Sequence, residues 1–373
     1  TMPLQHMKYE AQLAFKQKQV KHVMNTIAKM PELEVRSTIG MEHPFGYRNK
    51  AQIPVRMVDG LLTTGFFKKN SHDLVPIEDF HIQDPEIDRI ILVVRDILRK
   101  FAIEAYDEEK HTGDLRHIIV RRGLRTSQVM IILVTRTEKF PQKEAIVEQI
   151  TQQLPEVVSI VQNIQPHQSN VIMGAQKKVL FGEDAFQEKL MEFIFTISSR
   201  SFFQVNTIQT EVLYHEAIQA AGLTGDETVV DAYCGIGTMS LAFAKRAKKV
   251  YAMEIVPDAI QMAKENARNN QIDNVTFEVG AAEKVMPTWV DSGLQPDVIV
   301  VDPPRKGLDA AFIDAAVKTK ARKIVYVSCN PATLARDLAL FQDEGYQALY
   351  AQPVDMFPMT TAIETVAVLE RMN

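Results

Sequence analysis

The chain has 373 residues, of which 46% are hydrophobic and 24% are charged, and its formal net charge is −5. This is the composition of a folded globular protein with room for two domains, so it excludes a disordered chain. The negative charge argues against indiscriminate coating of nucleic acid, but it leaves room for a local basic surface.

Signals for membrane insertion or export are absent from the sequence. No run approaches the roughly 20 apolar residues of a membrane span, and the first residues lack the basic-then-apolar layout of a signal sequence. We therefore expect a cytoplasmic protein without a membrane partner. Two cysteines, Cys234 and Cys329, supply neither a disulfide framework nor a thiolate cage, so we expect no metal site.

The first half of the sequence predicts an amphipathic helix followed by an α+β domain. Residues 9–30 place apolar side chains at helical spacing, which indicates a helix that packs on another part of the chain. Residues 47–58 and 61–67 alternate with period two around Asp59-Gly60, as in a hairpin. Further helices are expected over residues 85–102 and 141–154, and strands over 115–121, 128–135, 157–163, 179–181 and 193–197.

The loop RRGLRTS, residues 121–127, concentrates positive charge beside a glycine. It contains Arg121, Arg122 and Arg125. Such a loop is either a phosphate contact or a solvated hairpin tip, and charge alone does not separate the two interpretations.

From residue 202, helices and apolar strands alternate. Helices are expected over residues 207–221, 238–247, 257–269, from 310 and over 333–340, with strands at 228–232, 250–253, 275–279, 298–301, 324–327 and two more at the end. This alternation predicts a doubly wound, Rossmann-like parallel sheet. We divide the chain into an N-terminal helix (1–35) that packs on the last domain, a central α+β domain (36–197) and an α/β domain (198–373).

The run VVDAYCGIGT, residues 229–238, has the layout of a cofactor-binding loop. It joins a strand to a helix through Gly235 and Gly237, which allow the backbone to approach a ligand closely. Glu254, at the end of the next strand, suits the ribose hydroxyls of an adenosine. The ligand is either a dinucleotide or S-adenosylmethionine.

Two features favour S-adenosylmethionine. The third glycine of a dinucleotide loop is missing, and an acidic residue, Glu283, follows a third strand. Tyr233 is expected to flank the cofactor, its alternative role being a core aromatic.

The run VIVVDPPRKGLD, residues 298–309, follows an apolar strand with a stiff Asp-Pro-Pro turn. The turn holds Asp302 at the ligand crevice, as in enzymes that place an amino group or a base edge against a methyl donor. Alternatively, Asp302 is a helix cap. Arg305 is placed to meet a phosphate.

The run KIVYVSCNPATLARD, residues 323–337, places Cys329 at the carboxyl end of a buried strand, facing the same crevice. Pro331 suits the start of a helix, and the positive end of that helix is expected to favour the thiolate. A buried structural cysteine is the alternative, but the neighbouring motifs favour a reactive one.

With these motifs, the chain resembles the RNA 5-methyluridine methyltransferase family, the uracil-5-methyltransferases of 23S rRNA and tRNA, and looks nearer to the ribosomal RNA branch. The matching runs are SSRSFFQVN (198–206), DAYCGIGT (231–238), DPPRKGLD (302–309), SCNPATLARD (328–337) and DMFPMTTAIETV (355–366). YEAQLAFKQ and YRNKAQIPV extend the resemblance into the first half.

The resemblance implies catalytic roles for two residues. Cys329 would add to C6 of a uracil, and Glu364 would remove the C5 proton after methyl transfer. A surface charge is the alternative for Glu364, and Asp355 is the one competitor for the role of base in the same motif.

The resemblance also implies binding roles. Gln204, Tyr233, Glu254 and Asp302 would bind S-adenosylmethionine, and Phe202 would stack near the target base. RNA phosphates would meet cations of the central domain. Those candidates are Arg48, Lys50, Arg116, Arg121, Arg122 and Arg125.

The chain departs from the ribosomal branch at its cluster ligands. Those relatives commonly carry an N-terminal RNA-binding barrel and four cysteines for an iron–sulfur cluster, whereas here Met2 and Phe80 stand near two of the cysteine positions. We therefore expect no iron–sulfur cluster, either because the protein is a natural cluster-free member or because its sequence has been trimmed or altered.

We accordingly predict methylation of uridine C5 in 23S rRNA, with the T-loop of tRNA as the alternative target. An RNA-binding protein without activity would need neither Cys329 nor Glu364. An amino-methyltransferase would have no use for a covalent nucleophile.

Overall fold

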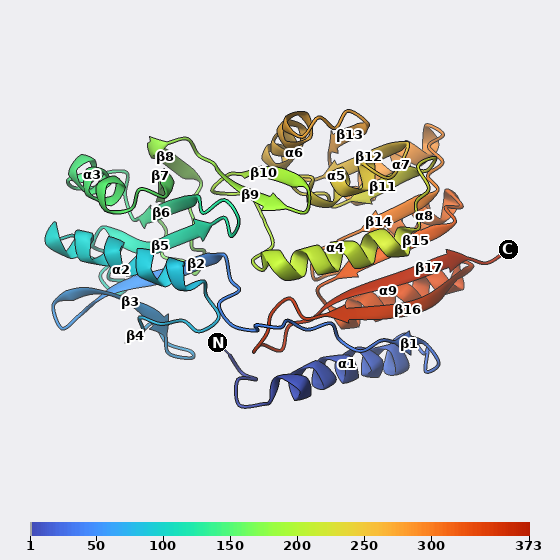
Figure 1. Cartoon of the computed structure of the whole chain (residues 1–373), viewed down its shortest axis with the longest axis horizontal. Helices are drawn as coiled ribbons and strands as arrows, with labels where there is room; N and C mark the ends of the chain where they lie inside the picture. Colours follow the sequence, from blue (N-terminus) through green and yellow to red (C-terminus); the bar gives the residue numbers. More distant parts are fainter. Residues whose placement is uncertain (1) are drawn as a thin grey trace. The chain divides into compact units, whose positions relative to one another are not determined.

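The computed structural model describes residues 2–373, which form two compact units (Figure 1). Unit 1 comprises the chain up to Pro44, Leu190–Ile194 and Ser201–Asn373, and unit 2 comprises Phe45–Lys189 and Phe195–Arg200. The N-terminal helix therefore belongs with the α/β domain. The boundaries predicted after residues 35 and 197 differ slightly from these. Unit 1 extends to Pro44, and the hairpin of β9 (Phe186–Leu190) and β10 (Phe193–Ile197) is divided between the two units.

Unit 1 is built on an eight-stranded sheet in the order β1-β16-β17-β15-β14-β11-β12-β13. The strands are β1 (Glu34–Val35), β11 (Thr228–Ala232), β12 (Lys249–Glu254), β13 (Val275–Val279), β14 (Val298–Val301), β15 (Lys323–Ser328), β16 (Tyr346–Val354) and β17 (Glu364–Arg371). All run parallel except β17, which lies antiparallel between β15 and β16. The chain order reverses between β11 and β14, the switch point where open α/β sheets bind ligands. The predicted Rossmann-like fold is confirmed.

Helices connect the strands of unit 1. They are α1 (Tyr9–Thr26), α4 (Thr207–Ala221), α5 (Thr238–Ala244), α6 (Pro257–Asn269), α7 (Ala282–Asp291), α8 (Ala310–Lys318) and α9 (Pro331–Asp343). The central strands are fully buried, and all four residues of β14 have 0% exposure. The sequence analysis missed α7 because Pro287 interrupts it.

Unit 2 is an α+β structure on a seven-stranded sheet in the order β4-β3-β2-β5-β6-β7-β8. Its elements are β2 (Lys50–Val58), β3 (Leu61–Phe67), β4 (Leu74–Pro76), α2 (Pro85–Lys100), β5 (Leu115–Arg122), β6 (Val129–Thr135), α3 (Lys143–Gln153), β7 (Val157–Ile164) and β8 (Gln176–Gly182). Asp59 and Gly60 both have left-handed backbone, with φ of 51° and 79°, which is the turn geometry that suits a two-residue hairpin. The predicted hairpin is therefore present.

Phe80, at one expected cluster-cysteine position, is part of the apolar core of unit 2. Its side chain is 6% exposed and meets the Phe66 ring edge-on, with 4.7 Å between ring centroids. Within residues 2–373, no group of three or more His, Cys, Asp or Glu side chains has a geometry that could hold a metal ion. Over the same range, no helix is both long and apolar enough to cross a membrane.

Candidate active site

The antiparallel strand β17 brings the predicted nucleophile and base together. Because β17 runs against β15, its first residue lies at the edge of the sheet where β15 ends. Ser328 of β15 pairs with Thr365 of β17, so the next positions in this register are Cys329 and Glu364. Asp302 follows directly after β14, the neighbour of β15 on its other side, and completes the group at this edge.

The three side chains influence one another's ionisation. Glu364 is only 4% exposed. Burial, and to a smaller extent the charge of Asp302, raises its pKa well above the usual range. Burial raises the pKa of the Cys329 thiol, and the charges of Glu364 and Asp302 raise it further. The Arg305 guanidinium opposes the shift at both groups. Cys329 and Glu364, the predicted nucleophile and base, therefore share one partly dehydrated, acidic environment.

The predicted stabilisation of a Cys329 thiolate by the following helix meets opposing influences. Burial and the charges of Glu364 and Asp302 raise the pKa of Cys329. The amide end of α9 is also satisfied by its own cap, since the Asn330 side chain accepts the backbone N–H of Ala332 at 3.1 Å.

Residues of α9 hold the loop that carries Arg305. The Nδ2 of Asn330 and the Oγ1 of Thr333 both donate to the Arg305 carbonyl, at 2.9 and 3.0 Å. The two motifs that contain Asp302 and Cys329 are thus one hydrogen-bonded structure. The sequence analysis assigned no role to these contacts, since the two motifs are separated in sequence.

Gly307 shows how tightly this loop is held. Its φ is +77°, and a Cβ placed there would lie 2.6 Å from both the Nη2 of Arg336 and the Oδ2 of Asp337. Asp337 is fully buried and accepts the N–H of Leu308 at 2.8 Å and the hydroxyl of Tyr326 at 2.6 Å. Residues 307 and 308 of the DPPRKGLD run therefore serve the packing of the loop, in addition to any role of the run in catalysis.

The predicted cofactor loop has open space above it and an acidic residue at its side. Gly235 and Gly237 have φ of +56° and +87°. A Cβ on Gly237 would approach Ala263 at 3.3 Å, whereas nothing lies within 4 Å of one on Gly235. Glu254 accepts the N–H groups of Gly235 and Val256 at 3.2 and 3.3 Å, which fixes its carboxylate beside the loop. This geometry fits a nucleoside with two ribose hydroxyls.

Asp231 lies beneath the loop as a fully buried carboxyl. The Ser240 hydroxyl donates to its Oδ2 at 2.6 Å, while its Oδ1 has no hydrogen-bond partner within the described part of the chain. Burial raises the pKa of Asp231 to about 7, and burial together with the charge of Asp231 raises the pKa of Asp302 to about 7. The site thus holds several carboxyl groups that lack a counter-charge, as a cationic ligand requires.

The other predicted cofactor residues are Gln204 and Tyr233, with Glu283 beside the latter. Gln204 is 8% exposed and lies just before α4. Tyr233 has left-handed backbone, with φ of 65°, and its pKa is raised by burial and then by the charge of Glu283 in the first turn of α7. Its ring also lies 6.1 Å from that of Phe312, so Tyr233 has the core contact proposed as its alternative role.

Asp355, the competing candidate for the base, is occupied by contacts with the N-terminal helix. Asp355 is completely buried, its Oδ1 lies 2.5 Å from the Nζ of Lys16, and its Oδ2 accepts the Tyr9 hydroxyl at 2.8 Å. Asp355 therefore has a structural role, whereas Glu364 lies next in register to Cys329.

Tyr214 is a site residue that the sequence analysis missed. Its hydroxyl lies 2.7 Å from the Oγ1 of Thr238 in the first turn of α5. Burial and the charges of Asp302, Asp231 and Glu364 raise its pKa. In sequence Tyr214 looks like an ordinary buried position of α4, so no local signal identifies it.

Several arginines predicted to contact RNA are structural instead. Arg121 is 2% exposed, and its guanidinium donates to the Ser198 carbonyl at 3.0 Å. Arg116, 4% exposed, donates to the Gln165 carbonyl at 2.7 Å. These two are withdrawn from the predicted RNA surface because their charged groups are not available to a phosphate.

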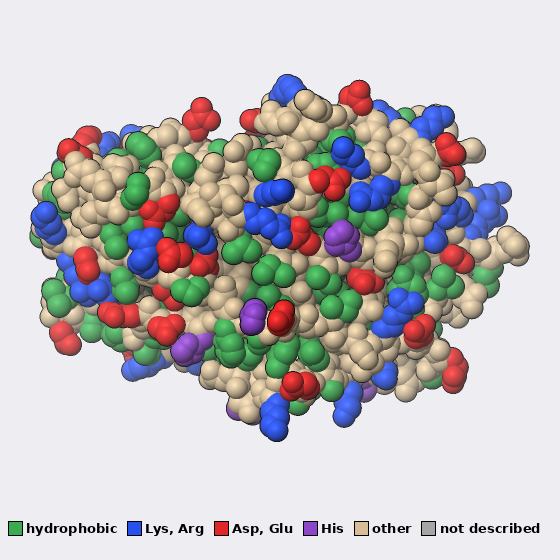
Figure 2. All heavy atoms as spheres, viewed as in Figure 1, with side chains coloured by type: hydrophobic (Ala, Val, Ile, Leu, Met, Phe, Trp, Pro, Cys, Tyr) green, Lys and Arg blue, Asp and Glu red, His purple; other side chains and the backbone are tan. Residues whose placement is uncertain are grey.

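The remaining cations of unit 2 differ in exposure. Burial lowers the pKa values of Arg48 and Lys50, the latter to about 8, and Arg122 pairs with Asp84 at 2.6 Å. Arg125 is exposed at the loop tip. Figure 2 shows basic and acidic side chains interspersed over the face in view, in keeping with the net charge of −5.

Phe202 and Arg305 of unit 1 are exposed. The Phe202 side chain is 73% exposed, more than any other large hydrophobic residue in the described part of the chain. Arg305 is exposed and influences both Cys329 and Glu364 electrostatically. Both residues are therefore available to a substrate.

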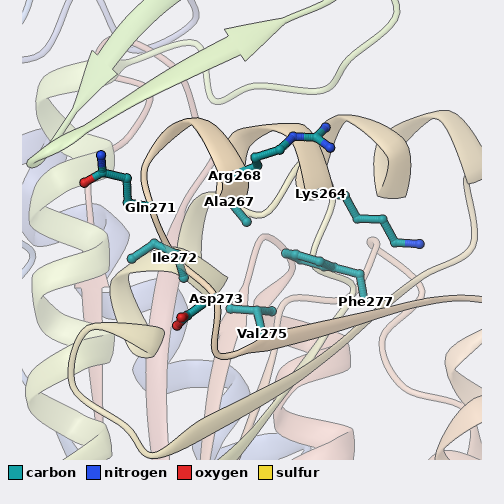
Figure 3. Close-up of a pocket in the computed structure, with 8 residues that line it drawn as sticks. All are labelled: Lys264, Ala267, Arg268, Gln271, Ile272, Asp273, Val275 and Phe277. Atoms are coloured by element: carbon teal, nitrogen blue, oxygen red, sulfur yellow. The ribbon is translucent and has the colours of Figure 1, made fainter.

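A separate hollow of about 480 Å³ lies between α6 and β13 (Figure 3). Lys264 and Arg268 of α6 line one side, and Val275 and Phe277 of β13 line the other. None of the eight residues drawn there belongs to the predicted site, so the hollow is distinct from the group around Cys329.

Comparison with known proteins identifies a family. A family model described as tRNA (Uracil-5-)-methyltransferase matches residues 8–372. An uncharacterized RNA methyltransferase of Enterococcus faecalis is 53% identical over 369 residues, covering 99% of this chain and 81% of the relative. One from Lactiplantibacillus plantarum is 54% identical over 370 residues, with the same coverage.

A solved structure shares the fold over almost the whole chain. It is the Pyrococcus abyssi tRNA (uracil-54, C5)-methyltransferase in complex with S-adenosyl-L-homocysteine. The TM-score is 0.81 and the sequence identity 28%, covering 98% of this chain and 83% of the archaeal one.

The raised pKa of Asp231 predicts a pH dependence of stability. Between pH 5 and 7 the unfolded chain has released this proton while the folded protein, with a pKa of about 7, still holds it, so this group's contribution to the free energy of unfolding falls as pH rises. Asp231→Asn cannot ionise, so its stability relative to wild type should increase by up to about 1.4 kcal/mol per pH unit over that range. Urea unfolding at several pH values measures this difference.

Glu227→Gln is the matched control, because hydrogen bonds to Thr224 and Gly225 lower the pKa of Glu227 to about 2. The contribution of Glu227 to the free energy of unfolding is lost only as pH falls below about 4.5. The difference in unfolding free energy between Glu227→Gln and wild type should therefore be constant from pH 5 to 7. A constant difference for Asp231→Asn as well would show that Asp231 ionises normally.

Proposed function

The chain belongs to the tRNA (uracil-5-)-methyltransferase family, and on this basis we propose that it methylates C5 of a uridine in 23S rRNA through a covalent bond between Cys329 and C6. The observation that carries the proposal is the register of β15 and β17, which places Cys329 and Glu364 side by side. A thiol and a carboxylate are the two groups that this chemistry needs.

The roles follow from the reactivity of uracil. C5 is too weak a nucleophile to take a methyl group unaided. The Cys329 thiol first gives up its proton to solvent, and the thiolate then adds to C6, so that the electron pair of the C5–C6 double bond becomes an enolate that is nucleophilic at C5. After methyl transfer, Glu364 removes the C5 proton, the double bond re-forms, and the C6–S bond breaks to release the thiolate.

The elevated pKa of Glu364 suits this role. A carboxylate with a raised pKa is a stronger base than an exposed one, and its burial keeps water from competing for the proton. The positive charge of Arg305 opposes the rise in the pKa values of both reacting groups and so stabilises their charged forms.

S-adenosylmethionine, when bound, supplies an electrophilic methyl group on a positively charged sulfur. Residues around the cofactor loop fit it by their chemistry, with Glu254 facing the ribose and the uncompensated carboxyls of Asp231 and Asp302 favouring a cation. The residues that would hold it are Gln204, Tyr233, Gly235, Gly237, Glu254, Glu283 and Asp302.

For the RNA, we assign Phe202 to base stacking and Arg305 to a phosphate near the reacting groups, since both are exposed on unit 1. On unit 2, Arg125 is the exposed arginine of the predicted loop and Arg122 keeps part of its surface accessible. Arg48 is a weaker candidate, because burial lowers its pKa.

The choice of RNA rests on the motif resemblance to the ribosomal branch. A tRNA target is the second candidate, favoured by the likeness to the Pyrococcus abyssi tRNA (uracil-54, C5)-methyltransferase. Both candidates use the same chemistry, so the site does not distinguish them.

Methyl transfer to defined RNAs separates the two candidates. Labelled S-adenosylmethionine is supplied with unmodified 23S rRNA and unmodified tRNA in parallel, and the labelled base is identified after digestion. We expect label in 5-methyluridine from 23S rRNA. Label from tRNA alone would replace the rRNA assignment, and label in an exocyclic amino group would contradict the chemistry.

Glu364→Gln should leave the enzyme trapped after methyl transfer. The amide cannot accept the C5 proton, so the methylated adduct with ordinary uridine RNA should accumulate while turnover falls by about a hundredfold or more. Denaturing electrophoresis detects the adduct, and labelled methyl incorporation measures turnover.

Glu370→Gln is the matched control, since Glu370 lies on the same strand but at its exposed end, 3.7 Å from Lys323. It should turn over normally and form no lasting adduct. Normal turnover by Glu364→Gln would mean that another group is the base.

A further inference from the structure

The segment between β16 and β17 leads directly to the base. We call residues 355–363 the base loop, because Glu364 follows it. One face of α1 contacts this loop through Tyr9, Gln12 and Lys16. Their spacing of three and four residues places them on the same side of the helix.

Lys16 and Asp355 form a completely enclosed ion pair. Both side chains have 0% exposure, and the Nζ of Lys16 lies 2.5 Å from Oδ1 of Asp355. The same ammonium donates to the Phe357 carbonyl at 3.1 Å, and Tyr9 donates to the second carboxylate oxygen at 2.8 Å. One lysine of α1 therefore fixes two points of the base loop.

Gln12 fixes a third point, at Met359. The backbone of Met359 is left-handed, with φ of 71°, which is unusual for a residue with a side chain. Its N–H donates to Oε1 of Gln12 at 3.0 Å, and its carbonyl accepts the N–H of Leu4 at 3.0 Å. Gln12 is itself fully buried, so the N-terminal segment maintains a loop conformation that costs free energy.

The start of α4 holds the base loop from another element. The Nε2 of Gln209 donates to the Asp355 carbonyl, and the Nδ2 of Asn206 donates to the Met356 carbonyl, both at 3.1 Å. Asn206 caps α4 and follows Gln204, the proposed cofactor residue, by two positions. The base loop is thus tied both to α1 and to the segment that leads from the cofactor site.

We propose that Lys16 is a positioning residue for Glu364, acting through its ion pair with Asp355. A buried ion pair contributes little net stability compared with apolar residues of similar size, and its best-attested use is to specify one geometry. A general base must lie within hydrogen-bond reach of the proton that it removes, and displacement by about 1 Å can cost a hundredfold in rate. The proposal rests on the assigned role of Glu364.

The test replaces the pair by apolar residues of similar size. Lys16→Met alone leaves a buried carboxylate without its partner and should destabilise the protein, whereas Lys16→Met with Asp355→Leu should restore the thermal unfolding midpoint. We expect the double variant to fold and to lose at least about tenfold in kcat, with KM for RNA and for S-adenosylmethionine changed by no more than about twofold. It should also accumulate the methylated adduct with ordinary RNA.

Val20→Ala is the matched control on α1. Val20 is fully buried in the core cluster of unit 1, one turn beyond Lys16. The variant should lower stability but keep the wild-type kcat per folded molecule and show no adduct. Adduct accumulation separates a misplaced base from a loss of folded protein.

The outcomes distinguish the two proposals. A stable double variant with wild-type kcat, or with a loss of kcat and no adduct, overturns the positioning role. If the double variant does not fold, Tyr9→Phe and Gln12→Ala replace it, and wild-type kcat in both overturns the role equally. Wild-type protein that forms no adduct with 5-fluorouridine RNA would instead contradict the proposed function itself.

Discussion

The site depends on the direction of one strand. In unit 1 every strand except β17 points its carboxyl end to the same edge of the sheet, and β17 alone begins there. Because β17 is reversed, its first residue, Glu364, lies beside Cys329, the residue that follows β15. The hydrogen-bond register of β15 and β17 therefore fixes the separation of the two reacting groups, and a shift by one residue would turn Glu364 to the opposite face.

Around this pair the structure gathers acidic groups and keeps them from water. Asp231, Asp302 and Glu364 all have raised pKa values, chiefly through burial. Such an arrangement is unfavourable in the free protein and becomes favourable when a positive charge enters. Arg305, held by α9, is the cation that acts on both Cys329 and Glu364. The same acidic neighbours raise the pKa of the Cys329 thiol, so a positively charged ligand would favour its ionisation.

Sequence patterns predicted an element correctly where its hydrophobic periodicity agrees with the residues that begin and end it. Examples are α6 and β13, whose bounds match the prediction. They failed where a tertiary contact decides. Arg121 looks like an exposed loop cation, but its burial follows from the Ser198 carbonyl, 77 residues away. Asp355 and Glu364 share a motif, and the contact of Asp355 with Lys16, 339 residues away, distinguishes their surroundings. The helix after Cys329 suggested a thiolate because local sequence does not show the neighbouring carboxyls.

The most direct test of the central claim is to identify the residue that bonds to the substrate. The wild-type protein is incubated with S-adenosylmethionine and 5-fluorouridine RNA. Because C5 then carries fluorine in place of the hydrogen that a base removes, the covalent complex is trapped, and it is digested and analysed by mass spectrometry. We predict a methylated fluorouridine nucleotide on the peptide that contains Cys329. A nucleotide on the Cys234 peptide, or an unmodified Cys329 peptide from the 5-fluorouridine incubation of protein that methylates ordinary RNA, would contradict covalent catalysis by Cys329.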